Sequence, residues 1–182
     1  SLCVVLGVAS AKSVLAGFGN PTIFVFLGSF ILAQAMTVHG LDRRLALTIL
    51  GTPWVGNSVR RLIFAFGLVA AFLSMWLSNT ATTAMLLPVA LGILREVGGL
   101  EEKRTGQPVD IRHLRISTGL MLMTAYAASV GGIGTPIGTP PNLIGIGLLD
   151  ELAGKRISFT SWMAMAVPLL LAMYGVLYLL II

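Results

Sequence analysis

Three adjacent polar residues, Ser78, Asn79 and Thr80, stand inside an uncharged, mostly apolar run that extends from 62 to 94. Their hydroxyl and amide groups can offer oxygen ligands to a hard cation and hydrogen-bond donors to an anion. A helix that ends at this step exposes free carbonyls, and a helix that begins there exposes free N–H groups. The step therefore suits a site for a cation, an anion or both. A simpler role, in which Asn79 or Thr80 only caps the second helix, is also open.

The segments on either side of the step are too short to cross a membrane alone. Arg61 and Arg95 bound the run, which leaves about 16 residues before the step and about 14 after it. At about 1.5 Å per residue each helical arm reaches about 20 to 25 Å, less than the roughly 30 Å of a hydrocarbon core. Basic residues favour the cytoplasmic side, so both ends are expected there. The pattern predicts a re-entrant helical hairpin over 62–94 with the polar step at its tip.

A second uncharged run, from Ile116 to Leu149, is interrupted by four glycines and three prolines between 131 and 142. Such a stretch cannot continue a regular helix, so we expect a broken transmembrane helix over 116–150. Two discontinuous apolar segments close in sequence are typical of a transporter binding site. Gly134 and Gly138 also have the spacing of small residues in helix packing, which leaves a purely structural role open. A dinucleotide-binding fingerprint is excluded, because Ile137 stands where its third glycine would be.

The composition excludes an ordinary soluble domain. Hydrophobic residues make up 56% of the 182 residues and charged residues only 10%. The net charge of +5 comes from short Lys and Arg clusters between apolar segments, which orient a membrane chain and do not form a nucleic-acid-binding face. The single cysteine, Cys3, excludes an internal disulfide. We expect an all-α, multi-pass integral protein of the cell (inner) membrane with the lipid bilayer as its surroundings.

The remaining segments complete the expected topology. Residues 21–38 predict a spanning helix that runs inward, because Arg43 and Arg44 follow it. Apolar residues recur every four positions between 41 and 49, which fits either a short helix in the membrane interface or a connecting loop.

The polar stretch 95–115 predicts a solvated cytoplasmic loop, and 160–182 a last membrane helix. The chain starts without Met, its first nine residues look like the tail of a spanning helix, and it stops inside an apolar run. We therefore expect a piece of a larger protein.

The polar step and the glycine-proline stretch together carry a resemblance to a known family. The run from Ser78 to Pro88, SNTATTAMLLP, resembles the first Ser-Asn-Thr signature of the divalent anion/sodium symporter family, the sodium-coupled dicarboxylate and citrate carriers. The run from Gly138 to Asn142, GTPPN, resembles the partner loop of the same repeat. The resemblance covers nearly the whole chain in order. It implies one half of an inverted-repeat transporter, the N-terminal repeat, with a re-entrant hairpin and a broken helix.

The resemblance also implies roles for individual residues. A sodium ion would be held by Ser74, Ser78, Asn79 and the backbone of Gly138. A substrate carboxylate would be held by Asn79, Thr80 and Thr139. The Gly-Thr-Pro pattern of Gly138 also occurs four residues earlier, so the placement of Gly138 and Thr139 is the less specific part of the match. A site without Asp or Glu would bind sodium weakly and release it, as a carrier requires.

For the whole protein the resemblance implies sodium-coupled transport of small divalent anions, with C4-dicarboxylates such as succinate expected, by an elevator-type alternating-access mechanism. Residues 1–60 would belong to a scaffold that forms a homodimer, and 61–182 to half of a mobile transport domain. A second inverted repeat, absent from this sequence, would complete the site.

Other functions are weighed against this one. A sodium-independent anion exchanger or a sulfate carrier could use the same frame, and a re-entrant loop with a polar tip also describes a passive channel. An enzyme with Ser78 as nucleophile is disfavoured, because neither interrupted run contains a His, Lys or carboxylate to act as its base.

Overall fold

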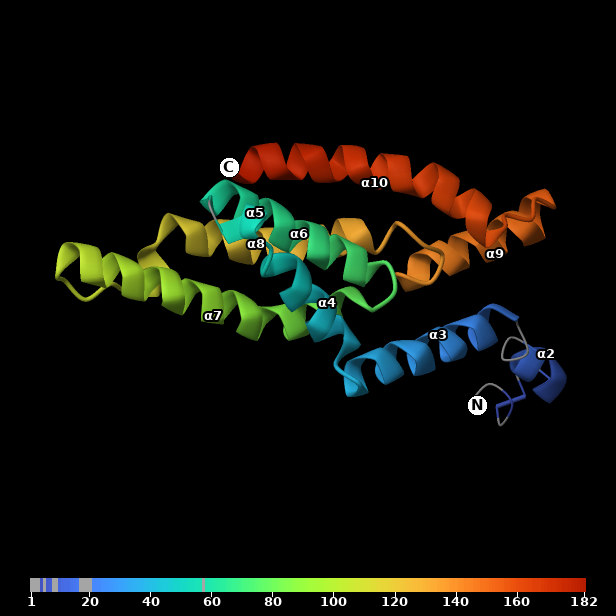
Figure 1. Cartoon of the computed structure of the whole chain (residues 1–182). Helices are drawn as coiled ribbons and strands as arrows, with labels where there is room; N and C mark the ends of the chain where they lie inside the picture. The colour runs from blue at the N-terminus through green and yellow to red at the C-terminus, as the bar shows by residue number, and fades with distance from the viewer. Residues whose placement is uncertain (1–3, 5, 8–9, 17–20, 57) are drawn as a thin grey trace.

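The structure is a computed structural model that describes residues 4, 6–7, 10–16, 21–56 and 58–182, and every regular element in these residues is helical. The helices run in the order α2 (Ala11–Ala16), α3 (Pro21–Val38), α4 (Leu41–Leu50), α5 (Pro53–Gly56), α6 (Val59–Ser74), α7 (Asn79–Thr105), the 3-10 turn η2 (Ile111–His113), α8 (Arg115–Gly131), α9 (Pro140–Ala153) and α10 (Phe159–Ile181). Figure 1 shows an elongated bundle in which α6, α7, α8 and α10 lie roughly along one direction.

The chain reverses direction at the polar step. Helix α6 ends at Ser74, α7 begins at Asn79, and α7 runs back toward the end of the molecule where α6 started (Figure 1). The Ser78 hydroxyl caps α7 by accepting the backbone N–H of Ala81 at 3.2 Å. The predicted pair of antiparallel arms is therefore present.

Helix α8 packs against both arms and forms the core with them. Phe66, Leu86, Leu120 and Met123 are fully buried at this contact. The close approach of α8 to α6 requires a residue without a side chain, because a Cβ atom on Gly131 would overlap the backbone of Ala71. This contact fixes the end of α8 beside the end of α6.

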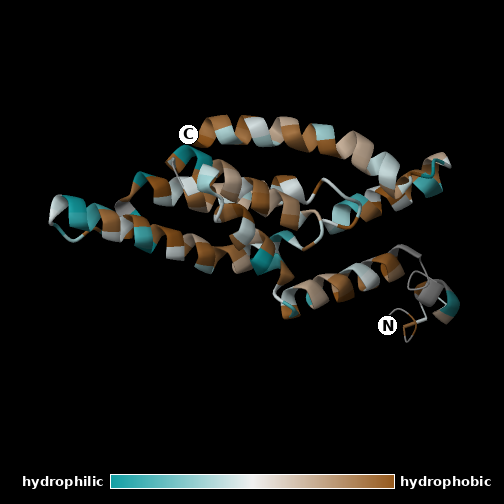
Figure 2. Ribbon diagram, in the orientation of Figure 1, coloured by the Kyte–Doolittle hydropathy of each residue, from teal (hydrophilic) through white to brown (hydrophobic). Residues whose placement is uncertain are grey.

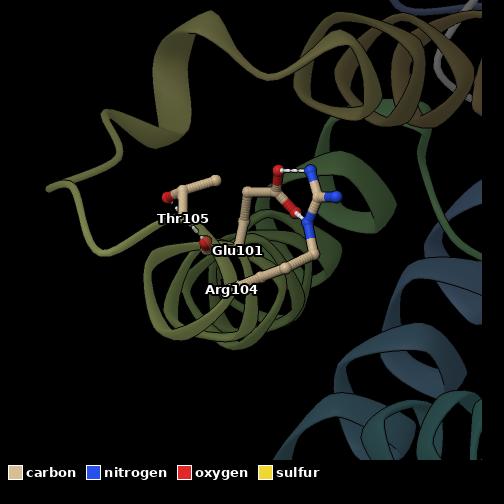
Figure 3. Close-up of polar contacts among 3 residues, drawn as sticks. All are labelled: Glu101, Arg104 and Thr105. Atoms are coloured by element: carbon tan, nitrogen blue, oxygen red, sulfur yellow. Dashed lines mark hydrogen bonds and ion pairs between the residues drawn. The ribbon is translucent and has the colours of Figure 1, made fainter.

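The second arm is longer than expected. We predicted a solvated loop over 95–115, but α7 continues to Thr105, and the loop begins only at Gly106. Glu, Lys, Arg and Leu are good helix formers and outnumber the two glycines at 98 and 99 in this part. Lys103 and Arg104 lie in the last turn, and Gly106 ends the helix with a φ of 69°. The Arg104 guanidinium also pairs with the Glu101 carboxylate (Figure 3). The polar sequence was interpreted as a loop, but it belongs to an exposed helix.

Two helices are long and apolar enough to cross a membrane, namely α7 and α10, judged by length and composition within the described residues. The expectation that neither hairpin arm could span alone is therefore wrong for α7, which has 27 residues. A third candidate is the pair formed by Ile23–Val38 and α4, bent by 61°. In Figure 2 polar residues gather at the far end of α7 and at the connection between α9 and α10, with apolar residues along the helices between them.

The segment 41–50 is a helix and not a connecting loop. In α4 the side chains of Leu45, Ala46 and Ile49 are at least partly buried, whereas Arg43 and Arg44 are exposed. Helix α4 packs against α6 with this apolar side. Residues 11–16 also form a helix, α2. Most of the helix tail expected over 1–9 lies outside the described residues.

The second apolar run is broken where predicted. Helix α8 ends at Gly131, α9 begins at Pro140, and 132–139 form the connection. The prolines at 140 and 141 occupy the first turn of α9, where their missing N–H groups cost no hydrogen bond. Helix α10 then runs back from the end of α9 and packs against α8 (Figure 1).

Candidate site at the meeting of two interrupted helices

The two interruptions of the chain lie against each other. The hydroxyl of Thr135, which is fully buried, donates to the carbonyl oxygen of Met75, just after the end of α6. A Cβ atom on Gly138 would lie 3.0 Å from the carbonyl oxygen of Ser74 and 2.6 Å from that of Gly132. Only glycine permits so close an approach of the backbone. The loop 132–139 thus packs directly on the last turn of α6.

Two predicted sodium ligands contact each other at this meeting point. The Ser74 hydroxyl, which is fully buried, donates to Asn79 Oδ1 at 2.7 Å across the reversal of the chain. The Asn79 side chain lies against the loop, because a Cβ atom on Gly132 would be 2.5 Å from Asn79 Oδ1. Hydroxyl, amide and backbone oxygens from both interrupted segments therefore converge within a few ångströms.

The cap of α7 is Ser78, and not Asn79 or Thr80 as the capping alternative proposed, because α7 already begins at Asn79. The Ser78 side chain is exposed, and its oxygen accepts the N–H of Ala81. The hydroxyl oxygen has a second lone pair, so capping and binding an ion are compatible.

The two predicted substrate threonines lie at helix starts. Thr80 is exposed in the first turn of α7, and Thr139 is the partly exposed N-cap of α9. The Thr139 hydroxyl makes no capping hydrogen bond. The start of α7 offers free N–H groups to an anion, whereas the prolines at 140 and 141 have none, so the Thr139 hydroxyl is the donor at the start of α9.

The two Gly-Thr-Pro repeats have different positions. Thr135 of the first repeat is buried and ties the loop to the end of α6, whereas Thr139 of the second repeat begins α9. The repeat that matched the family signature is the one whose threonine remains partly exposed.

Sequence reasoning missed two side chains that hold the loop. Asn142, in the first turn of α9, donates through Nδ2 to the carbonyl oxygens of Gly132 and Thr135, each at 2.8 Å. The Trp162 indole N–H of α10 donates to the carbonyl of Ile133 at 3.0 Å. Asn142 could have been found as the one polar side chain directly after the two prolines. Nothing in the sequence marks Trp162, because its contact depends on how α10 returns.

The site holds no fixed charge. Within the described part of the chain, no cluster of three or more His, Cys, Asp or Glu side chains could hold a metal ion. A cation at the meeting point would be surrounded by neutral oxygens alone.

Comparison with known proteins places the chain in a family. A family model described as citrate transporter matches residues 1–182. The chain is 37% identical over 172 residues to the sodium-dependent dicarboxylate transporter SdcS of Staphylococcus aureus, in strains NCTC 8325 / PS 47, COL and N315. The match covers 94% of this chain and 32% of each relative, so the chain spans about a third of their length.

These relatives are transporters and not enzymes, which confirms the resemblance inferred from the sequence. Together with the apolar helices they indicate a multi-pass protein of the cell membrane. The chain belongs to the citrate transporter family.

Proposed function

We propose that this chain carries one half of the binding site of a sodium-coupled carrier of small divalent anions, C4-dicarboxylates such as succinate in particular. The observation that carries the proposal is the hydrogen bond between Ser74 and Asn79 where two interrupted helices meet. The name of the relative, a sodium-dependent dicarboxylate transporter, supports the ion and the substrate class.

Sodium is proposed to bind to oxygens of Ser74, Ser78, Asn79 and the carbonyl of Gly138. Sodium is a hard cation that prefers oxygen ligands, and unwound backbone supplies them in transporters of this kind. Within the described residues, no hydrogen bond uses the Gly138 carbonyl, so its oxygen remains able to accept an ion. Neutral ligands would let the ion leave again.

The substrate carboxylate is proposed to bind to Asn79, Thr80 and Thr139. The Thr80 and Thr139 hydroxyls lie at the starts of α7 and α9, where the helix dipoles favour a negative charge. Asn79 can serve both partners, because its amide oxygen accepts and its NH₂ group donates. Bound sodium at Oδ1 would then hold the NH₂ group in place for the carboxylate, which links the two binding events.

The larger mechanism is part of the same proposal. Residues 1–60 would form part of a scaffold that dimerises, and 61–182 half of a transport domain that carries the site across the bilayer in an elevator-type cycle. The hairpin would be re-entrant, with its tip inside the membrane, because α6 has only 16 residues and is too short to cross alone, although α7 is long enough. A second inverted repeat would supply the other half of the substrate site.

Uptake of labelled succinate by the full-length protein in proteoliposomes tests the proposal. With an inward sodium gradient we expect saturable uptake, and with potassium in place of sodium at least about tenfold less. Asn79→Ala should abolish uptake in both conditions, because it removes a ligand of each partner. Linear, unsaturated flux would instead indicate a channel.

An anion exchanger is the second candidate, since it could be built on the same frame. It predicts uptake that ignores sodium and requires dicarboxylate or another anion inside the vesicles. That outcome would overturn the sodium roles of Ser74, Ser78 and Gly138.

A further inference from the structure

We propose that Asn142 is a positioning residue for sodium binding, which acts by holding the loop 132–139 so that the Gly138 carbonyl is presented to the ion. The inference rests on the proposed function and adds to it a residue that does not touch the ion.

The Asn142 amide nitrogen makes two hydrogen bonds to the loop from the start of α9. The residue is buried, with 8% of its surface exposed, and its Nδ2 donates to both Gly132 and Thr135 at 2.8 Å. These two carbonyls stand three residues apart in the loop. A single amide group therefore sets the width of the loop, since the two acceptors must stay within reach of one nitrogen.

The same carbonyls lie next to the proposed sodium ligands. The Gly132 carbonyl oxygen is the atom that a Cβ on Gly138 would approach to 2.6 Å. The Cα atom of Gly132 is close to Asn79, because a Cβ atom built on it would lie 2.5 Å from Asn79 Oδ1. A shift of Gly132 would therefore move the surroundings of Gly138 and of Asn79 together.

The side-chain donors also determine which carbonyls remain for an ion. Asn142 occupies those of Gly132 and Thr135, and the Trp162 indole occupies that of Ile133. The Thr135 hydroxyl occupies the carbonyl of Met75. Among the described residues, the carbonyls of Gly134, Pro136, Ile137 and Gly138 are left without a donor. Of these four residues, Gly138 lies against the Ser74 carbonyl at the end of α6, which makes its carbonyl the candidate ion ligand.

A purely structural role for Asn142 makes a different prediction. If Asn142 only stabilised the start of α9, its loss would lower the thermal stability and leave the sodium affinity of the folded protein unchanged. The positioning role predicts that the sodium affinity changes by a larger factor than the KM for succinate measured at saturating sodium.

The test uses the full-length protein in proteoliposomes with labelled succinate. Asn142→Asp keeps the shape but replaces the donating nitrogen by an oxygen that faces two carbonyl oxygens. We expect the sodium concentration for half-maximal uptake to rise at least about tenfold, as for the loss of a pair of buried hydrogen bonds. The KM for succinate at saturating sodium should change by less than about twofold.

Thr124→Val is the matched control. It also removes a buried side-chain hydrogen bond to a carbonyl, that of Leu120, but inside α8 and away from the loop. Its half-maximal sodium concentration should stay within about twofold of wild type. If Asn142→Asp does not fold, Asn142→Gln takes its place, because it keeps both donors but moves them by one methylene, and a rise of at least about threefold is expected.

An unchanged half-maximal sodium concentration in the folded Asn142 variant would overturn the inference. A wild-type protein whose uptake ignores sodium would overturn the proposed function first. The two failures are therefore distinguishable in one set of measurements.

Discussion

Asn79 combines an oxygen that accepts and a nitrogen that donates in one short side chain at the reversal between α6 and α7. Its oxygen already accepts from the Ser74 hydroxyl at 2.7 Å and lies against Gly132. A residue in this position can therefore bind a cation through its oxygen and an anion through its nitrogen. Aspartate would lose the donor and add a fixed charge, which suits release of a cation less well.

Thr82, one turn into α7, presents a different situation. Its side chain is fully buried, and its hydroxyl has no hydrogen-bond partner among the described residues. An unpaired buried hydroxyl costs about 1 to 3 kcal/mol. The hydroxyl is therefore expected to be dispensable for stability.

Thr82→Val should leave the free energy of unfolding in potassium unchanged or raise it by up to about 1 kcal/mol, because valine has the same shape without the hydroxyl. Thermal unfolding measures this change. The half-maximal sodium concentration should not move. A loss of sodium dependence in this variant would show that the hydroxyl is an ion ligand that the account leaves out.

At the scale of elements, the contact between α6 and α8 sets the relative position of the two interruptions. At Gly131, directly before the loop, the two helices are so close that a Cβ would overlap the backbone of Ala71. Backbone atoms in a packed helix cannot move aside as a flexible side chain can.

Gly131→Ala should destabilise the protein by about 1 to 3 kcal/mol, as overpacking in a core does. Gly175→Ala in α10 is the control, because a Cβ there meets nothing within 4 Å, and it should be neutral or slightly stabilising. Thermal unfolding in detergent measures both. Equal effects of the two substitutions would contradict the close packing of α6 on α8.

Local chemistry explains which elements were predictable. Prolines 140 and 141 and the glycines before them mark the break between α8 and α9. The start of α7 was predicted within the polar step, but its cap is Ser78 and not Asn79 or Thr80. The extension of α7 to Thr105 was not predicted, because charged residues were read as a loop although their helix propensity is high. Polarity alone does not distinguish an exposed helix from a loop.

The site was predictable only in part for a related reason. Ser74 and Asn79 lie five residues apart, so a short reversal is enough to join them. The contacts of Thr135 with Met75 and of Trp162 with Ile133 join residues 60 and 29 positions apart. These contacts depend on the packing of α8 and α10, which the sequence pattern does not specify.

At the scale of the whole molecule, the chain spans about a third of the relatives that it matches. The proposed substrate ligands Asn79, Thr80 and Thr139 can hold one carboxylate, whereas a dicarboxylate presents two. A dicarboxylate carrier as proposed would therefore need a second set of ligands from outside these 182 residues.

The 182-residue chain alone, reconstituted in liposomes, should show no sodium-driven succinate uptake above that of empty vesicles. The reason is that half of the proposed substrate site is missing. The full-length protein reconstituted in parallel is the control. Net uptake by the chain alone would contradict the proposed need for a second repeat.

The most direct test of the central claim is the effect of sodium on the thermal unfolding of the purified full-length protein, compared with potassium at equal ionic strength. A ligand that binds only the folded state at about 100 times its Kd stabilises it by about 2.7 kcal/mol. The proposed ion site predicts a sodium-specific rise in unfolding temperature that disappears in Asn79→Ala and persists in Thr124→Val. An equal response to sodium in wild type and Asn79→Ala would contradict an ion site between α6, α7 and the loop 132–139.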